Sequence, residues 1–462
     1  MLKRMRSFLV LVMLFIAVTM SAQVTTATMS GKVTAQDEPI IGATVVAVHE
    51  PSGTRYGTVT NVSGQFNLQG MRTGGPYKVE ISYVGYQTAI YKGINLLLGE
   101  NYVLNVSLKE SSELLDEVVV TASKESNMKS DRAGAIMNAN RDMISNTPTI
   151  SRSISDIMRL SPQGADVGNG FAVGGGNYRQ SFVTVDGAAF NNTFGLGGNL
   201  PANGSPISLD ALEQVTVAVT PFDVRQSGFT GGAINAVTRS GDNQFRGTAY
   251  MYFNNENLKG SKVDDYELLR SKAQYYTYGA SFGGPIIKDK LFFFVNGEYE
   301  DNVTAGSNYR PRTALGESYS GGNIHRPLQS DMDDMRGFLL NKYNFDPGKY
   351  NDYSTDTPAY RVMARVDWNA NQNNKVSFRF TKTHTKDSNF PTSSVSPLST
   401  SALYPGGTST EVIDGKPVGT IAPGQGRTSK YALSFSNSNY YQVRDFTSVA
   451  GEWNSRMAQG AM

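Results

Sequence analysis

The chain has 462 residues and a formal net charge of +2, which is too small to indicate a nucleic-acid partner. It contains no cysteine, which excludes disulfides and thiol chemistry, and its length predicts more than one domain. Its 47 glycines, 24 tyrosines and 22 phenylalanines favour a β protein with many turns, of which a membrane barrel is one kind.

The first 22 residues are predicted to be a secretory signal peptide. Lys3, Arg4 and Arg6 form a basic start, a mostly apolar run covers residues 7–20, and the small Ala22 precedes the expected cleavage site. A membrane anchor is the less favoured alternative, because the run is shorter than the ~20 apolar residues that a spanning helix needs.

Residues 23–110 are predicted to form a small β-sandwich. Short alternating segments such as "GATVVAVHE" and "YKVEISYVGYQT" are separated by turn residues such as "DEP" and "NVSG". The pattern "G.V......PI.GA.V.......GT.TN..G.F.L" resembles the carboxypeptidase regulatory-like, or transthyretin-like, domain. This resemblance implies the fold of that domain and no peptidase activity.

Residues 111–132 contain a strongly β-prone segment between two folded regions. The segment is too short to form a core and has no turn partner nearby, so it is expected to be unpaired within the chain. Two alternatives stay open: it could be the last strand of the preceding sandwich, or a linker. A polar stretch at residues 124–140 follows as a tether. The residues of the β-prone segment are Asp116, Glu117, Val118, Val119, Val120, Thr121 and Ala122.

Residues 133–243 are predicted to mix short helices, strands and glycine turns. Apolar residues of "TISRSISDIMRLSPQ" recur at helical spacing, and a second short helix is expected to end near Glu213. Strands are expected at residues 182–185, 215–219 and 233–238. The glycines are interpreted as turn residues, because the helix and lysine of a phosphate-binding loop do not follow them.

In order and spacing this region resembles the plug domain of TonB-dependent outer-membrane receptors. "VTVDGAAF" resembles the family's "v.vDGv" strand, and "LEQVTVAVTPFDVRQSGFTGGAINAVTRSG" resembles its "iE.IEV..GP....yG....GG.INI.TK" block. Departures at residues 219–222 and 226–228 point to the Oar-like subgroup, which carries an N-terminal sandwich. The resemblance implies that two plug loops face the substrate, with the candidate residues Asn177, Tyr178, Arg179, Asn191 and Asn192.

From residue 244 to residue 462 the chain alternates with a period of two. In "YRVMARVDWN", Tyr360, Val362 and Trp368 share an apolar face, and Arg361 and Arg365 share the opposite face. A soluble sandwich would show the same alternation. Aromatic residues at strand ends favour a membrane barrel, as does the succession of short turns (288–290, 369–374) and long polar connections (302–359, 388–429).

Six or seven strands are expected after Phe245, whereas a plugged barrel has ~22. So few strands cannot enclose a plug, and the chain is therefore expected to be an N-terminal fragment with an open, incomplete wall. The predicted fold is mainly β: a transthyretin-like sandwich, an α/β plug domain and the first strands of a large transmembrane barrel.

The resemblance also implies a function. The β-prone segment at residues 116–122 would be a TonB box, docking on the C-terminal domain of TonB, which the ExbB/ExbD motor energises. The other partners implied are outer-membrane lipid and an unknown transported substrate. Two alternatives stay open: a SusC-like glycan importer paired with a surface lipoprotein, and a non-transporting adhesin or scaffold.

Enzyme activity, cofactors and metals are not expected. The three histidines (His49, His325 and His384) lie far apart and lack metal-ligand spacing, and no nucleophile-elbow motif marks a serine. The acidic cluster "DMDD" at residues 331–334 favours a solvated loop face, and a calcium site in an outer loop is the less favoured alternative.

Overall fold

Strands dominate the described part of the chain, which confirms the mainly β fold. The predicted signal peptide lies outside the described residues. No helix within the described segments is long and apolar enough to cross a membrane. The computed structural model describes residues 25–110, 118–121, 136–149, 152–167, 170–191, 200, 206–219, 231–258, 260, 262–263, 266–267, 272–307, 309–319, 323–389, 412–413, 416–417 and 433–455.

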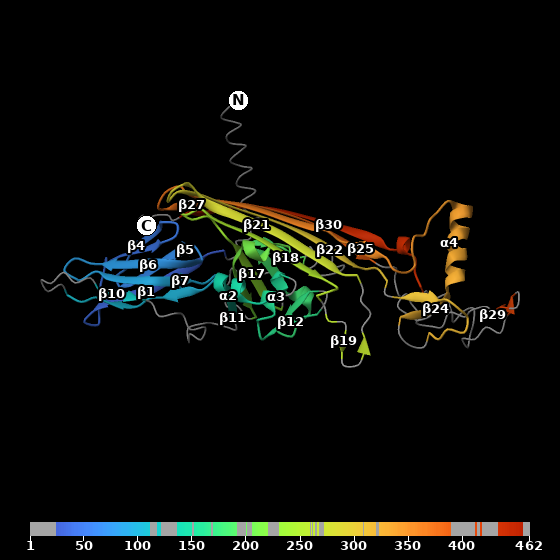
Figure 1. Cartoon of the computed structure of the whole chain (residues 1–462). Coiled ribbons are helices and arrows are strands. Elements are labelled where there is room, and N and C mark those ends of the chain that lie inside the picture. The colour runs from blue at the N-terminus through green and yellow to red at the C-terminus, as the bar shows by residue number, and fades with distance from the viewer. Residues whose placement is uncertain are drawn as a thin grey trace, which may run out of the picture.

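Two sheets form a β-sandwich near the N-terminal end of the described chain (Figure 1). Alternate residues of their strands are buried and form one apolar core, which includes Val45, Phe66 and Leu68. The first sheet has the order β2-β1-β5, with β8 and β9 also paired to β1; its strands are β1 (Ala27–Ala35), β2 (Glu38–Pro39), β5 (Gln65–Met71), β8 (Asn101–Val103) and β9 (Val106–Ser107). The second has the order β10-β7-β6-β3-β4; its strands are β3 (Thr44–His49), β4 (Thr54–Val59), β6 (Gly74–Ser82), β7 (Ala89–Leu96) and β10 (Val118–Thr121).

A second module contains a five-stranded sheet of order β11-β16-β17-β14-β15, with short helices packed against it. The central strands β16 and β17 are buried along nearly their whole length, so they read as continuous apolar runs rather than as alternating ones. The elements are β11 (Ile136–Asn140), β14 (Phe182–Val185), β15 (Ala188–Ala189), β16 (Leu212–Ala218), β17 (Ala233–Thr238), the hairpin β12 (Gly164–Asp166) and β13 (Phe171–Val173), the helices α2 (Arg141–Asn146) and α3 (Ile154–Met158), and the 3-10 turns η1 (Tyr178–Gln180) and η3 (Leu209–Ala211).

Two of the expectations for this module need correction. The helix expected to end near Glu213 is a single 3-10 turn, η3, capped by Ser208, and strand β16 already begins at Leu212. Glycine has a second role besides turn geometry: a Cβ on Gly232 would lie 2.5 Å from Val173, so this glycine permits close packing. The predicted strand at residues 233–238 is confirmed as β17.

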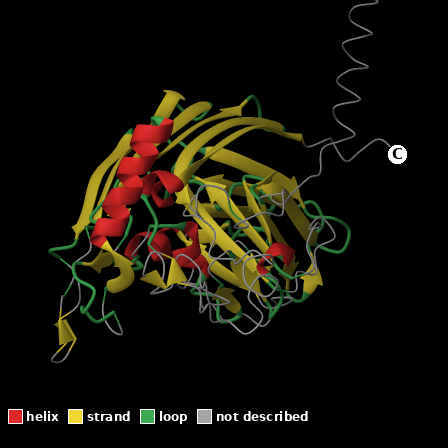
Figure 2. Cartoon of the chain, turned by 90° about the vertical axis from the view of Figure 1, so that its right-hand side faces the viewer, coloured by secondary structure: helices red, strands yellow, loops and turns green. Residues whose placement is uncertain are grey.

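A seven-stranded antiparallel sheet forms a curved wall along one side of the second module (Figures 1 and 2). Its order is β18-β21-β22-β26-β27-β30, and the sheet does not close, because β18 and β30 each pair with a single neighbour. The expectation of an open barrel wall is therefore confirmed. Its strands are β18 (Arg246–Asn255), β21 (Gln274–Ile287), β22 (Leu291–Ala305), β25 (Ser354–Asp356, paired to β22), β26 (Ala359–Asn369), β27 (Asn374–Asn389) and β30 (Tyr440–Ser455).

The long connections contain regular structure that the sequence analysis missed. The acidic cluster expected in a loop lies on helix α4 (Gln329–Tyr343), which has Asp331 in its first turn, Lys342 in its last turn and Asn344 as a left-handed C-cap. Asp333 accepts a hydrogen bond of 2.7 Å from the Tyr350 hydroxyl. The remaining short elements are β19 (Lys262–Val263), β20 (Tyr266–Glu267), β23 (Arg310–Arg312), β24 (Ile324–Leu328), β28 (Val412–Ile413), β29 (Lys416–Pro417) and the 3-10 turn η4 (Ser436–Ser438).

Candidate functional site

The two faces of the wall differ as the alternation predicts. Trp368 and Phe378 point outward and are 51% and 52% exposed, whereas Arg361 and Arg365 point toward the plug-like module and are 4% and 7% exposed. Cross-strand pairing places outward side chains in two rows. One row, beside the short turns, contains the aromatic Trp368 and Trp453 together with Leu291 and Val376, and the other row contains Tyr278, Tyr299 and Tyr360. An apolar band between aromatic girdles suits a lipid-facing surface.

The inner face of the wall contacts the second module through buried charges. Asp186 lies in a turn with a left-handed φ of 50°, and its carboxylate accepts hydrogen bonds from the backbone N–H and the hydroxyl of Thr238 at 2.9 and 2.5 Å. Two wall guanidinium groups approach the same carboxylate: Arg365 at 3.6 Å and Arg379 at 3.7 Å. Because all of these side chains are buried, the charges depend on one another for compensation.

Each wall arginine also has a carboxylate on its own sheet. Arg365 forms a forked pair with Asp367, with N···O distances of 2.9 and 3.0 Å, and Arg379 contacts Glu452 at 2.6 Å. Asp186 therefore enters a network that is already charge-paired within the wall. Each arginine therefore has a carboxylate partner on the wall that does not depend on Asp186.

A second polar cluster joins β22, β26 and the turn η3. Glu298 accepts from Arg361 at 3.0 Å, from the Ser208 hydroxyl at 2.9 Å and from the Tyr250 hydroxyl at 2.5 Å. Ser208 is also the N-cap of η3. One serine therefore both begins a turn of the inner module and anchors it to the wall.

Several of the candidate substrate-facing residues form hydrogen bonds within the inner module. Asn177 caps η1 by accepting from the Arg179 backbone N–H at 3.0 Å, and the Arg179 side chain donates to the Tyr178 hydroxyl at 3.0 Å. Asn191 uses both ends of its amide within the module, accepting from Val183 N and donating to the Ser181 carbonyl. Asn192 lies outside the described residues. Contact of these five residues with a substrate stays a prediction.

The β-prone segment is paired, so the expectation of an unpaired strand was wrong. Strand β10 runs parallel to β7, with Val118 opposite Ala89 and Thr121 opposite Lys92. The physical reason is that β7 would otherwise be an edge strand with free backbone N–H and C=O groups, a property that the sequence of residues 111–132 does not reveal. The flanking residues of the candidate set, Asp116, Glu117 and Ala122, lie outside the described residues.

The sandwich also contacts the inner module directly, a contact that the sequence analysis did not anticipate. The Leu98 backbone N–H, two residues beyond β7, donates to the Gln214 side chain at 3.1 Å, and the Leu98 side chain is buried against Val237. Glu100 accepts a hydrogen bond from Asn138 on β11. These contacts join the end of β7 to the sheet of the inner module.

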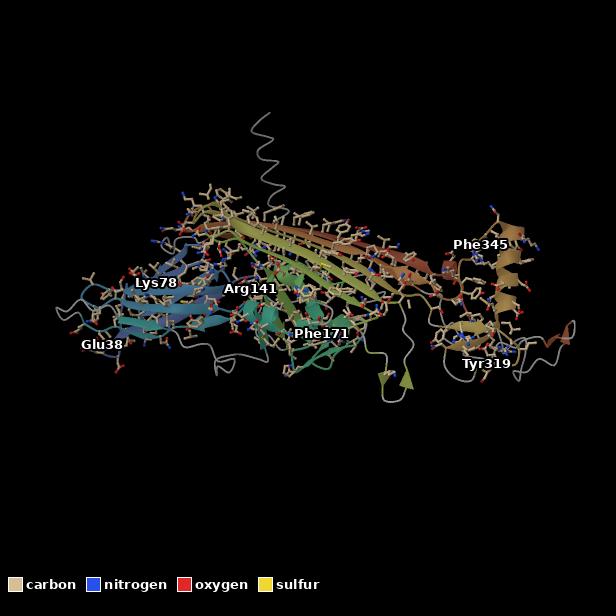
Figure 3. All side chains as sticks on the ribbon, viewed as in Figure 1. Glu38, Lys78, Arg141, Phe171, Tyr319 and Phe345 are labelled. Atoms are coloured by element: carbon tan, nitrogen blue, oxygen red, sulfur yellow. The ribbon has the colours of Figure 1, made fainter. Side chains whose placement is uncertain are left out.

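Further contacts join the sandwich to the end of the wall where short turns (288–290 and 369–374) connect the strands. Asn369 donates to the Thr54 hydroxyl at 2.9 Å, and the Lys375 ammonium lies 3.3 Å from the centroid of the Tyr56 ring. A cavity of about 580 Å³ lies between the three modules, and Arg141, one of its lining residues, is at this junction (Figure 3). Burial and then the charge of Arg141 lower the pKa of Arg239, which also lines the cavity.

The histidines have separate surroundings. His49 is buried in the sandwich, its Nδ1 lies 2.7 Å from the Ser52 hydroxyl, and burial, followed by the nearby Arg72 charge, lowers its pKa to about 3. His325 stacks on Tyr309 with ring centroids 4.0 Å apart, and His384 contacts Asp445 on the outer face of the wall. Within the described ranges, no group of three His, Cys, Asp or Glu side chains could hold a metal ion.

Family comparisons identify two of the three modules. Residues 28–109 match the carboxypeptidase regulatory-like domain, and residues 237–415 match an outer membrane beta barrel domain. The chain is 27% identical over 256 residues to the TonB-dependent transporter Oar of Myxococcus xanthus, and 29% identical over 269 residues to the TonB-dependent receptor SusC of Bacteroides thetaiotaomicron. These alignments cover 54% and 55% of this chain but only 22% and 24% of the relatives.

Two solved structures match part of the chain. The siderophore receptor PirA from Acinetobacter baumannii has a TM-score of 0.36 at 17% identity, over 54% of this chain and 31% of that chain. The outer membrane transporter YddB from Escherichia coli has a TM-score of 0.39 at 11% identity, over 56% of this chain and 34% of that chain. From the family and sequence matches, the chain is a homologue of TonB-dependent transporters that resides in the outer membrane. The similar identities to Oar and SusC do not separate those two types.

Proposed function

We propose that this chain belongs to a transporter that moves a substrate across the outer membrane with energy delivered through TonB. The single observation that supports this most is the packing of the inner module, the candidate plug, on the polar face of the wall. A barrel blocked by a folded plug cannot pass a large solute unless the plug is moved. Moving it would break the contacts that join it to the wall, such as those of Asp186 with Arg365 and of Ser208 with Glu298, so an external source of energy is needed.

The segment at residues 116–122 is the proposed coupling site. It precedes the plug in the chain, and its central four residues already adopt strand geometry in β10. Backbone pairing with a strand of the TonB C-terminal domain requires β-propensity more than particular side chains, which suits three consecutive valines. Each backbone hydrogen bond contributes roughly 0.5–1.5 kcal/mol, so a few of them give a reversible grip.

Binding of the TonB C-terminal domain to the detergent-solubilised chain tests this proposal. Val119→Pro removes a backbone donor in mid-strand, and the loss of one or two hydrogen bonds plus the ring clash should weaken binding roughly tenfold or more. Asn127→Pro, in the tether beyond the segment, is the matched control and should bind as the unmodified chain does. Equal binding by both variants, or no binding by the unmodified chain, would refute the coupling role.

A further inference from the structure

Strand β10 is the outermost strand of its sheet. The order β10-β7-β6-β3-β4 gives it one neighbour, and no other described strand pairs with it. The pairing with β7 covers Val118 to Thr121 in continuous parallel register. One edge of β10 is thus used inside the sandwich, and the other edge has no partner among the described residues.

The geometry of a strand makes the two edges independent. The N–H and C=O of one residue point to the same edge, and those of the next residue point to the opposite edge. Pairing with β7 therefore uses alternate residues of β10 and leaves the residues between them directed away from the sandwich. A strand added from another protein would use this second set, so it could bind without displacing β7.

We propose that the sandwich is a docking platform: it holds the β10 strand in extended form and presents the free edge of β10 to the energising partner. This inference rests on the proposed function, because that function supplies the partner, a protein that adds a strand by backbone pairing. Ordering one residue costs about 1–2 kcal/mol of conformational entropy, and the sandwich has already ordered four residues before the partner arrives.

The platform has a second connection, to the plug. The chain leaves β7 at Leu96 and reaches the plug within two residues, through the hydrogen bond from Leu98 to Gln214. Gln214 donates in turn to Asn138 on β11, the first strand of the plug sheet. A pull on β10 is therefore carried to the plug by hydrogen-bonded neighbours, in addition to the covalent path along residues 122–135.

A reversible crosslink between β10 and β7 distinguishes this platform from the alternative, in which pairing with the sandwich blocks binding of TonB to β10. Val120 and Tyr91 are Cα partners in the register, and adjacent strands bring Cα atoms to roughly 5 Å, within the range that a disulfide spans. The chain contains no other cysteine, so the double variant Val120→Cys/Tyr91→Cys can form a single bridge. The reduced double variant and each single variant are the controls for folding and for side-chain loss.

The platform predicts that the oxidised double variant binds the TonB C-terminal domain within about twofold of its reduced form, or more tightly, because strand order is retained. It also predicts that TonB bound beforehand does not protect the two cysteines from oxidation. Roughly tenfold weaker binding after oxidation, protection by bound TonB, or failure of the bridge to form would each overturn the platform. Failure of the proposed function looks different, because the unmodified chain would then not bind TonB at all.

Discussion

The interior of the sandwich and the contact between plug and wall are both buried, yet they are built from opposite kinds of side chain. The sandwich core is a continuous cluster of apolar residues such as Val45 and Leu68. The plug and wall meet through Asp186, Arg365 and Arg379, with only a few apolar residues such as Phe294 between them. Apolar burial stabilises a module that stays folded as one unit. Charged groups can be hydrated again on separation, which suits the proposed transport function, in which this contact opens.

The largest effect is expected from removing the plug carboxylate at this contact. Asp186→Ala leaves the buried N–H and hydroxyl of Thr238 without their acceptor and removes one of the two carboxylates beside each wall arginine, so the plug and its contact with the wall should together lose about 2–4 kcal/mol. Limited proteolysis of the detergent-solubilised chain should then cut the plug much faster, while the sandwich stays resistant.

A matched control is available in the same module. Asp166 pairs with Arg159 at 2.5 Å, but this arginine side chain is 52% exposed, and exposed pairs contribute about 0–1 kcal/mol. Asp166→Ala should therefore leave proteolysis of the plug nearly unchanged. Equal sensitivity of the two variants would show that buried charge does not hold the plug on the wall.

The two regions also differ in how far the sequence could predict them. The strands of the sandwich and the faces of the wall follow from local alternation, because one face of each strand is apolar over several residues. In the sequence, Asp186 is only the acidic residue of the "VTVDGAAF" motif. Its arginine partners lie about 180 and 190 residues later, at positions 365 and 379, and no local pattern connects residues so distant.

The pairing of strand β10 and the presence of helix α4 were not predicted, and the reasons are related. Whether β10 pairs depends on the free edge of β7, which is a property of the folded sheet. Helix α4 begins without a side-chain cap at Leu328 and has a weakly amphipathic sequence, so neither of the usual helix signals marked it. The boundaries of the three modules stay predictions, since they rest on the same kind of local pattern.

His49 is a titratable group buried in the sandwich, so the pH dependence of unfolding tests how strongly that module disfavours a buried charge. Its pKa is lowered from 6.5 to about 3, mainly by burial, so between these values the unfolded chain binds a proton that the folded chain does not. Stability is therefore fully present above pH 6.5 and falls as the pH is lowered. From pH 7 to pH 5 the loss should be about 2 kcal/mol. Urea unfolding of His49→Gln should show a smaller pH dependence over this interval, and an unchanged slope would assign the acid loss to other groups.

The smallest effect is expected where the sandwich contacts the wall through one cation and one aromatic ring. Lys375 on the wall lies over Tyr56 of the sandwich, and a cation–π contact of this kind contributes about 0.5–1 kcal/mol at a partly exposed site. Lys375→Met keeps the length of the side chain and removes the charge, so amide hydrogen exchange near residues 54–56 should rise by a few-fold. Lys78→Met, which removes an exposed partner of Glu80 within the sandwich, is the control and should leave that exchange unchanged. If both variants behave alike, the sandwich is held to the wall by its hydrogen bonds, such as that from Asn369 to Thr54, and the cation adds nothing measurable to them.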